Sequence, residues 1–269
     1  MTMNSILKAE IREKCAHLDI PLVGVASTDR WKKPLFHPWI PEEFHPQSIF
    51  KEAVSVIVIG LPVSLPVIET TPSIYYHELY RTINTMLDQY GYRLSNFLNN
   101  KGYPSIFVPR DGYGDISILI ENPVVFFSHK HAAYLAGLGN FGVNNTLLTK
   151  AYGPRVRFTS IFTSADLPPD PLMGKDLCIR CMDCVKCCPV GAIDEQDYPE
   201  GIINKKHCAR YSEQLRNRYI SPCGVCIKVC PVGDDRAHYE RQDTSIYTDP
   251  KKNPEYKKSW EHVRQYGGK

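Results

Sequence analysis

The sequence predicts an α+β domain followed by a separate cysteine-rich domain. The first part of the chain combines helical apolar patterns with short apolar runs typical of strands. Nine of the ten cysteines lie instead between Cys178 and Cys230. We therefore expect an α+β domain over residues 1–170, a cysteine-rich domain over 171–235 and a polar C-terminal tail over 236–269.

Each element follows from a local pattern. Apolar residues recur at helical spacing in four segments, 4–17, 73–99, 129–136 and 254–266. Apolar or alternating runs rich in β-branched residues predict strands at 21–26, 53–61, 105–108 and 155–163. The proline-rich segment 164–176 is predicted to link the two domains.

Composition and charge narrow the class of protein. The chain has 269 residues, a formal net charge of +3 and no block of lysine and arginine, so we do not expect nucleic acid as the main partner. Charges within the first fifteen residues exclude the apolar core of a signal peptide. The longest uncharged run, 53–68, is short and interrupted by glycine and proline, so no membrane span is expected. We expect a cytoplasmic protein.

The cysteines form an imperfect internal repeat. The spacing C-x2-C-x2-C-x3-C-P runs from Cys178 to Pro189, and its later portion recurs from Cys223 to Pro231. The tetrapeptide CPVG occurs in both copies. The counterpart of Cys178 in the second copy would be Ile220, and the nearest available cysteine is Cys208.

This spacing is typical of proteins that bind two [4Fe–4S] clusters, in which the cysteine before proline serves the other cluster. We therefore assign the first cluster to Cys178, Cys181, Cys184 and Cys230, and the second to Cys188, Cys208, Cys223 and Cys226. Zinc is an alternative, but it requires neither the third cysteine nor the C-P endings. A disulfide scaffold would require an oxidising compartment, which no export signal indicates.

A glycine-rich segment from Gly137 to Gly142 matches G-x-G-x-x-G literally. A dinucleotide site would need a strand before this segment and a helix after it, whereas the sequence predicts the reverse order. The glycines allow the backbone to approach another group closely, either in a tight turn or around a ligand. Asn144 and Asn145 add polar side chains beside this approach.

The segment from Ser128 to Leu167, followed by the double cysteine motif, resembles epoxyqueuosine reductases, which are related to reductive dehalogenases. The resemblance extends over residues 53–233. It implies a corrinoid-binding domain similar to nitroreductase-like vitamin B12 chaperones, followed by a ferredoxin-like domain with two [4Fe–4S] clusters. It also implies bound cobalamin, a low-potential electron donor such as ferredoxin or flavodoxin, and a small or nucleoside-like substrate.

The resemblance suggests which residues bind the cobalamin and carry the chemistry. The implied cofactor-binding residues are Ala136, Gly137, Leu138, Gly139, Gly142, Asn144, Asn145 and Thr146. His129 is a candidate proton donor and Lys130 a group supporting an anion, and Tyr113 and Tyr75 are second-rank candidates for the proton donor by analogy with dehalogenases. The alternative is that Ser-His-Lys-His simply opens a helix with solvated side chains. His131 is expected to point away from this site.

Three features depart from the epoxyqueuosine reductase pattern. The catalytic aspartate of that family falls on Pro123, with Glu121 as the closest carboxylate. His129-Lys130 replaces an acidic-arginine pair, and Val143 replaces a lysine.

The sequence favours a corrinoid-dependent oxidoreductase. One alternative is an electron-transfer activator of another corrinoid protein, and another is a short enzyme acting on epoxyqueuosine in tRNA. A respiratory dehalogenase would require an export signal, which is not recognisable here.

Overall fold

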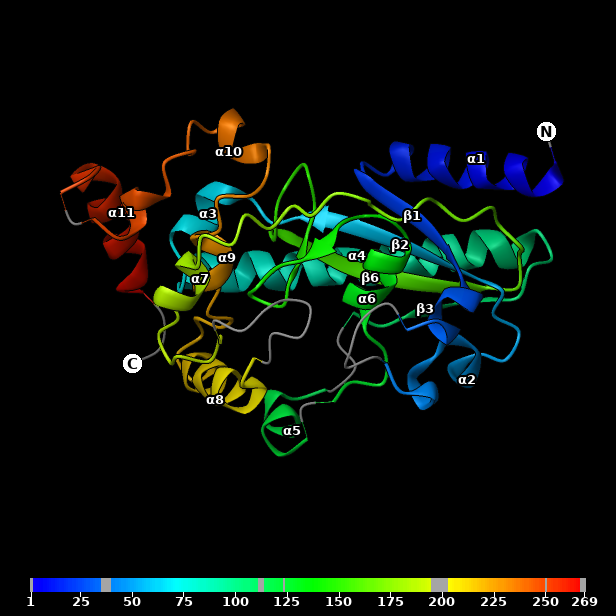
Figure 1. Ribbon diagram of the computed structural model, residues 1–269, viewed down its shortest axis with the longest axis horizontal. Coiled ribbons are helices and arrows are strands. Elements are labelled where there is room, and N and C mark those ends of the chain that lie inside the picture. Colours follow the sequence, from blue (N-terminus) through cyan, green and yellow to red (C-terminus); the bar gives the residue numbers. More distant parts are fainter. Residues whose placement is uncertain are drawn as a thin grey trace.

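An antiparallel four-stranded sheet, in the order β1-β2-β6-β3, forms the centre of the computed structural model. Residues 2–34, 40–110, 114–122, 124–194, 203–249 and 251–266 are described. The strands are β1 (Leu22–Ser27), β2 (Ser55–Pro62), β3 (Ser105–Val108) and β6 (Val156–Thr163). The predicted strands are all present, and the fold is mixed α/β (Figure 1).

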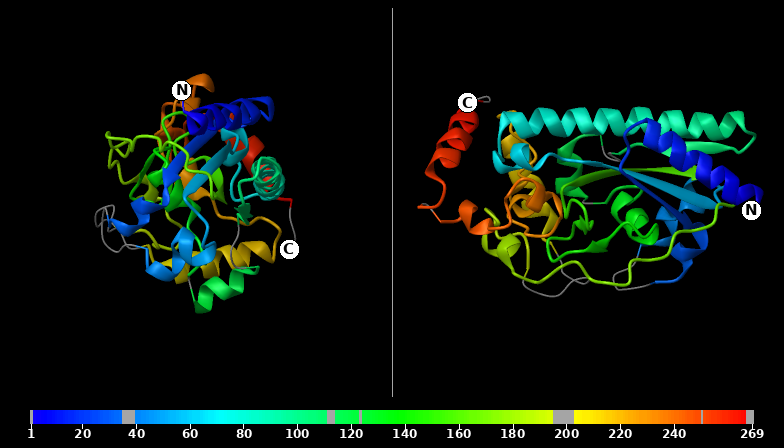
Figure 2. Two further views of the ribbon diagram at one scale, coloured as in Figure 1. Left: turned by 90° about the vertical axis from the view of Figure 1, so that its right-hand side faces the viewer. Right: turned by 90° about the horizontal axis from the view of Figure 1, so that it is seen from above.

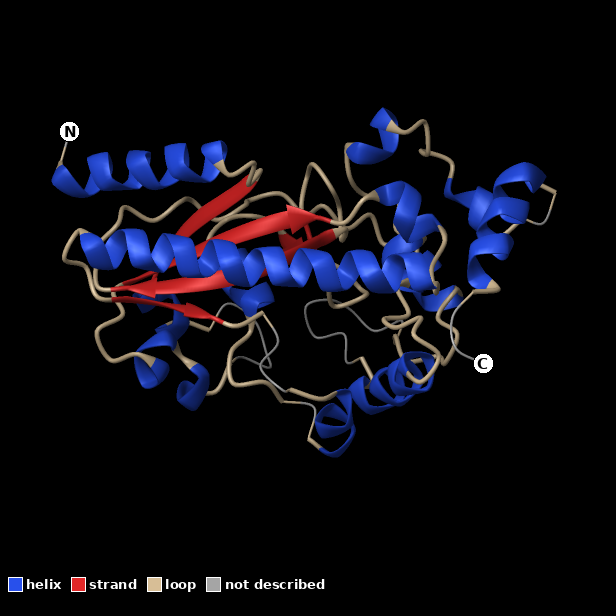
Figure 3. Cartoon of the chain, turned by 180° about the vertical axis from the view of Figure 1, so that it is seen from behind, coloured by secondary structure: helices blue, strands red, loops and turns tan. Residues whose placement is uncertain are grey.

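Helices cover both faces of this sheet. The long helix α4 and helix α1 lie on one face, and the short helix α6 lies on the other (Figures 1 and 3). The helices that precede the cysteine-rich part are α1 (Met3–His17), α2 (Pro46–Ile49), α3 (Leu65–Glu69), α4 (Ile74–Asn100), α5 (Ile116–Glu121) and α6 (His129–Leu135). Two 3-10 helices, η1 (Thr28–Lys32) and η2 (Glu42–Phe44), precede α2. Within the described residues, no helix is long and apolar enough to cross a membrane.

The central strand β2 is apolar on both sides because each side is covered. Ile57 and Ile59 pack with α1 and α4, whereas Val56 and Val58 pack with α6. All four side chains are fully buried. This double coverage explains why the strand is an almost continuous apolar run rather than an alternating one.

The segment 164–176, predicted as a linker, contains no helix or strand and is fixed against α1 and β1. The Asp170 carboxylate accepts hydrogen bonds from Lys8 Nζ at 2.7 Å and from Arg12 Nη2 at 2.9 Å. It also accepts one from the backbone N–H of Val25 at 2.9 Å. The linker is therefore held to both α1 and β1 on its way to the cysteines.

The cysteine-rich part lies at one end of the sheet, and helices α1 and α11 lie at opposite ends of the molecule (Figure 2). Its elements are α7 (Asp183–Lys186), α8 (Lys205–Arg216), α9 (Val225–Lys228), α10 (Asp235–His238), η3 (Thr244–Tyr247) and α11 (Pro254–Arg264). Helix α8 packs on α5 of the first domain. Helix α11, which Trp260 anchors at 6% exposure, confirms the helix expected from the sequence at 254–266, whereas α5 and α8 have no counterpart among the expected elements.

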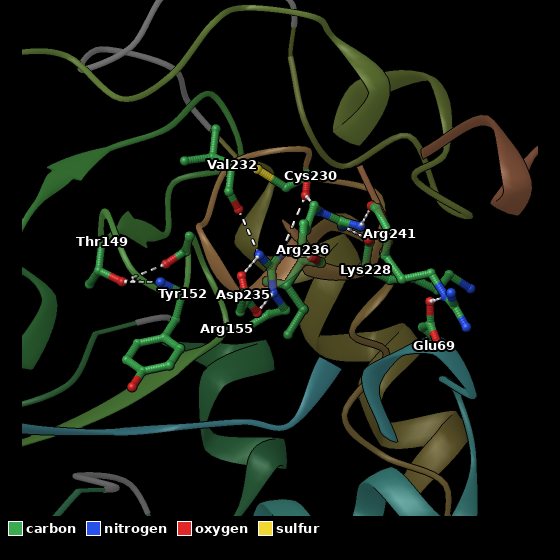
Figure 4. Close-up of polar contacts among 12 residues, drawn as sticks. Glu69, Thr149, Tyr152, Arg155, Lys228, Cys230, Val232, Asp235, Arg236 and Arg241 are labelled. Carbon is green, nitrogen blue, oxygen red and sulfur yellow. Dashed lines mark hydrogen bonds and ion pairs between the residues drawn. The ribbon is translucent and has the colours of Figure 1, made fainter. Parts of the chain in front are cut away.

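A buried arginine joins the sheet to the cysteine-rich part (Figure 4). Arg155 is fully buried and donates from Nε and Nη2 to the Asp235 carboxylate at 2.7 and 2.6 Å. It also donates to the backbone carbonyls of Cys230 at 3.3 Å and Val232 at 2.7 Å. The chains approach so closely here that a Cβ on Gly153 would lie 1.9 Å from the Val232 carbonyl oxygen.

We expect Arg155→Ala to lower the free energy of unfolding by about 3–5 kcal/mol, because it leaves the buried Asp235 carboxylate without its charge partner. Urea titration of anaerobically purified protein measures this loss. Arg12→Ala is the matched control, since it breaks an ion pair whose arginine is 48% exposed and should cost at most about 1 kcal/mol. Equal losses in the two variants would contradict the central role of Arg155.

Candidate functional site

Four thiols of the cysteine-rich part gather into what we call the first thiol group, formed by Cys178, Cys181, Cys184 and Cys230. Burial raises the pKa of the Cys184 thiol, and the other three thiols contribute because each disfavours a second negative charge nearby; together they bring it to about 12. All are free thiols. The structure therefore brings together the four residues that the interleaved spacing assigns to one cluster.

The second thiol group contains Cys188, Cys208, Cys223 and Cys226. Burial, together with the nearby thiols of Cys208 and Cys188, raises the pKa of Cys223 to about 11. Cys208 comes from helix α8, whereas Ile220, at the position expected from the repeat, is a buried apolar side chain. The substitute cysteine thus reaches the group from a different element.

Backbone N–H groups point at the sulfurs. Arg180, Met182 and Gly224 have left-handed φ angles of 53°, 62° and 70°, which curl the chain immediately before the short helices α7 and α9. The backbone N–H of Ala192 donates to Cys188 Sγ at 3.2 Å. Further N–H donors to thiols of both groups are Asp183, Val185, Val225 and Val232. Such donors stabilise thiolates and tune the potential of a bound cluster.

The two groups fit iron–sulfur cubes in the chemistry of their donors. In the described ranges, no three or more His, Cys, Asp or Glu side chains converge closely enough to hold a single metal ion. A cube makes no such demand, because each thiolate binds its own iron. Cys187 belongs to neither group and is half-buried. Burial and the charge of Asp183 raise the pKa of its thiol, and the charge of Lys228 partly opposes this shift.

Helix α6 faces the second thiol group through Lys130. Burial and, to a smaller extent, the nearby charge of Lys205 lower the pKa of Lys130 to about 8, although the thiols of Cys226 and Cys208 oppose this shift. Its Nζ donates to the Asn145 carbonyl oxygen at 2.6 Å. The predicted Lys130 is therefore directed inward, between the glycine-rich turn and the cysteines.

The two histidines beside Lys130 point in different directions. His129 forms hydrogen bonds with Ser160 Oγ at 2.9 Å and the Pro109 carbonyl oxygen at 3.0 Å, so it packs against the sheet. His131 instead lies 4.8 Å from the Phe141 ring, over which Lys130 Nζ also lies at 5.9 Å. The expectation that His131 points away from the Lys130 site is wrong. His131 and Lys130 both lie at the Phe141 ring, and His129 is the residue that faces the sheet.

Tyrosines from α4 also reach this region. Tyr113, a second-rank candidate for the proton donor, lies outside the described residues. Tyr75 is 56% exposed, whereas Tyr76 is buried, and burial, Tyr80 and the thiols of Cys226 and Cys223 raise its pKa. The sequence could have suggested Tyr76 only as part of the apolar stripe of α4.

Arg157 was also missed by the sequence analysis. Its guanidinium lies 4.4 Å from the centre of the Tyr80 ring, and its Nε donates to Asn84 Oδ1 at 3.1 Å. Its positive charge contributes to lowering the pKa of Lys130. Polar residues occur at alternate positions in any half-buried strand, so the sequence pattern does not single out Arg157 as a site residue.

The first two glycines of the turn are explained by close packing of the chain on itself. A Cβ on Gly137, whose φ is 73°, would lie 2.0 Å from the Pro171 carbonyl oxygen. One on Gly139 would lie 1.9 Å from the Leu148 carbonyl oxygen, across the two-stranded sheet of β4 (Asn140–Phe141) and β5 (Leu147–Leu148). The order helix α6, turn, strand β5 also agrees with the rejection of a dinucleotide site.

The second half of the turn faces the first thiol group. Gly142, Val143 and Asn144 line a hollow together with Cys178 and Cys184. Val143 is buried against Cys184, which explains an apolar residue at the position where the resembling family has lysine.

The remaining predicted cofactor residues do not line this hollow. Ala136 is buried beneath Gly24, and Leu138 packs with the core on the α6 side of the sheet. The Thr146 hydroxyl donates to Asn144 Oδ1 at 2.7 Å, and Asn145 receives Lys130.

No family model matches the chain. Curated relatives are an epoxyqueuosine reductase of Listeria monocytogenes, 29% identical over 72% of this chain and 52% of that protein, and a tetrachloroethene reductive dehalogenase of Desulfitobacterium hafniense, 24% identical over 65% of this chain and 32% of that protein. This chain therefore spans about half and about a third of their lengths.

Solved structures show the same fold. A selenomethionine-labelled epoxyqueuosine reductase matches 97% of this chain and 77% of its own with a TM-score of 0.58 and 20% identity. A catabolic reductive dehalogenase matches 93% of this chain and 35% of its own with a TM-score of 0.60 and 19% identity. The resemblance to an epoxyqueuosine reductase and reductive dehalogenase-like family is thus confirmed, and the relatives are named reductases, which is consistent with an oxidoreductase.

We expect Gly139→Ala to lower the free energy of unfolding by about 1–3 kcal/mol or more, because the added methyl group overlaps the Leu148 carbonyl oxygen. Gly174→Ala is the matched control, since nothing lies within 4 Å of its added Cβ. Denaturant titration of both variants measures the difference. A stable Gly139→Ala protein would show that β4 and β5 are not held this closely.

Stability should also fall in acid because of His131. Burial and the charges of Lys130 and Lys205 lower its pKa from 6.5 to about 3. Between these two values the unfolded chain binds a proton that the folded chain does not, so the contribution is intact above pH 6.5 and is lost as the pH falls. From pH 7.5 to 5.5 we expect His131→Gln to lose about 1 kcal/mol less free energy of unfolding than wild type. Parallel pH profiles would contradict the shift.

Proposed function

We propose that this chain is a cytoplasmic iron–sulfur reductase that passes electrons through two [4Fe–4S] clusters to a bound cobalamin and then to a small or nucleoside-like substrate. The observation that carries this proposal is the pairing of two complete thiol groups beside helix α6 and the glycine-rich turn. The named activity of the relatives supports a reductase. A low-potential ferredoxin or flavodoxin would supply the electrons.

The thiol and N–H donors present indicate what the chain would do and what the bound cofactors would do. When bound, the clusters supply one-electron transfer and the corrinoid supplies the reducing centre. The chain holds the clusters through eight thiolates and directs backbone N–H groups at their sulfurs. Residues 171–235 would form a ferredoxin-like domain, and residues 1–170 a nitroreductase-like domain that holds the corrinoid.

The side chains facing the second thiol group suit a corrinoid, whose edge carries amide groups that accept hydrogen bonds. Lys130 and Arg157 supply N–H donors there, and Asn145 supplies an amide. The depressed pKa of His131 keeps its imidazole neutral at physiological pH, so one ring nitrogen can accept and the other donate a hydrogen bond. His129, held between Ser160 and Pro109, would position α6 rather than meet the substrate.

Protein reconstituted anaerobically with iron, sulfide and cobalamin should retain about eight irons and one corrinoid per chain. Metal analysis and the absorption spectrum of the extracted corrinoid measure both. Eight irons without a corrinoid would contradict the cobalamin proposal and favour an electron-transfer activator of another corrinoid protein.

The interleaved ligand sets can be tested by substitution. Cys230→Ser and Cys178→Ser should each leave about four irons, and the double variant should lose no more, because both serve one cluster. Cys230→Ser combined with Cys223→Ser should remove both clusters. Cys187→Ser is the matched control and should keep about eight irons, since it lies in neither thiol group. Additive loss from Cys230→Ser and Cys178→Ser would overturn the assignment.

Epoxyqueuosine in tRNA is a second candidate substrate. A solved neighbour is an epoxyqueuosine reductase with a modified tRNA stem loop, matching 97% of this chain with a TM-score of 0.58. Our expectation that nucleic acid is an improbable partner is corrected on this ground. Glu121, the closest carboxylate to the expected catalytic aspartate, is exposed at the end of α5. Restoration of queuosine in tRNA of a reductase-deficient strain would support this substrate, and persistence of epoxyqueuosine would exclude it.

A further inference from the structure

We propose that a cavity between helices α9 and α11 binds a small molecule through its phosphate group. The cavity has a volume of about 450 Å³, within the usual range of about 300–1,000 Å³ for ligand pockets. Four cationic side chains line it: Lys228, Lys257, Lys258 and Arg264. The site is separate from the hollow at the first thiol group and from the Lys130 region.

Hydrogen bonds to carbonyl oxygens fix three of these cations without neutralising them. Lys228 Nζ donates to the Thr71 carbonyl at 3.1 Å, and Lys257 Nζ donates to the Asp249 carbonyl. Arg264 donates to the carbonyls of Thr70 at 2.8 Å and Glu69 at 3.1 Å. Carbonyl acceptors orient a cation but leave its full charge in place, which is the arrangement that an anionic ligand requires.

Two carboxylates lie nearby and leave the cavity positive. Glu261 lines it and acts on Arg264. The Glu69 carboxylate, whose charge also acts on Lys228, accepts a hydrogen bond from Arg241 Nε at 3.0 Å (Figure 4). It accepts another from the Tyr247 hydroxyl at 2.8 Å. Glu69 is therefore occupied by other donors, and four cations face one lining carboxylate.

An aromatic wall completes the cavity. The rings of Tyr247 and Trp260 lie 5.7 Å apart, and Tyr256 stacks on Trp260 at 6.1 Å. Tyr247 and Trp260 both line the cavity. Cationic groups together with a fixed aromatic surface suit a phosphate attached to a planar ring, as in a nucleoside monophosphate.

The cavity adjoins the second thiol group. Lys228 lies between Cys226 and Cys230 in the sequence, and its charge acts on the thiols of Cys223 and Cys187. On the proposed function, a bound phosphate would place negative charge beside the second cluster and make it harder to reduce. Binding itself does not depend on that function, so the two can fail separately.

Calorimetric titration of the anaerobic holoprotein at low salt tests the site, with adenosine monophosphate, adenosine, inorganic phosphate and a tRNA stem loop as probes. We expect the monophosphate to bind and uncharged adenosine to bind at least about tenfold more weakly, because charged hydrogen bonds are lost. Lys258→Gln should weaken monophosphate binding about tenfold. Lys251→Gln, which removes an exposed lysine outside the cavity lining, is the matched control.

The outcomes separate the sources of the phosphate. Binding of the stem loop alone, weakened by Lys258→Gln and not by Lys251→Gln, would keep the phosphate site but assign it to RNA and overturn the small-molecule ligand. Failure of all four probes, or equal effects of the two substitutions, would overturn the site. In holoprotein with full iron content, such failure would leave the proposed reductase function intact.

Discussion

The contact between Arg155 and Asp235 is the constraint on which the arrangement of the two halves depends. Arg155 immediately precedes strand β6. Its guanidinium donates hydrogen bonds to the buried Asp235 carboxylate and to the backbone carbonyls of Cys230 and Val232. Arg236 donates to the same Cys230 carbonyl at 2.7 Å. A ligand of the first thiol group is thus positioned by the sheet domain, although it is distant from the sheet in sequence.

A second set of contacts joins the sheet domain to the other thiol group. The Thr71 hydroxyl donates to the Cys223 carbonyl at 2.5 Å, and the His77 ring forms a hydrogen bond with the Ser221 carbonyl at 2.6 Å. A Cβ on Gly224 would lie 2.7 Å from Thr71 Oγ1 and from the Tyr76 ring. The backbone around both thiol groups is therefore in direct contact with the part of the chain that contains the sheet. That is the part in which we propose that the corrinoid binds.

The sequence predicted the elements whose patterns are local and strong. The strands at β2 and β6 and helices α1, α4 and α6 follow from apolar periodicity, and the cysteine spacing predicted which thiols would meet. Helices α5 and α8 were missed because they stabilise each other through tertiary packing, and α8 is polar around most of its surface. The directions of His129 and His131 depend on how α6 is rotated on the sheet, which periodicity in one short helix does not determine.

The delivery of Cys208 by helix α8 has a consequence for assembly. The other three cysteines of its group come from the tight turns around α7 and α9, whereas Cys208 comes from helix α8, which packs on α5. With the clusters bound as we propose, metal loading and tertiary docking would be coupled, as they are wherever a complete ligand set exists only in the folded chain. An isolated segment containing only the turn cysteines would present three sulfurs to the proposed second cube, and the fourth corner would be left to solvent or an external thiol.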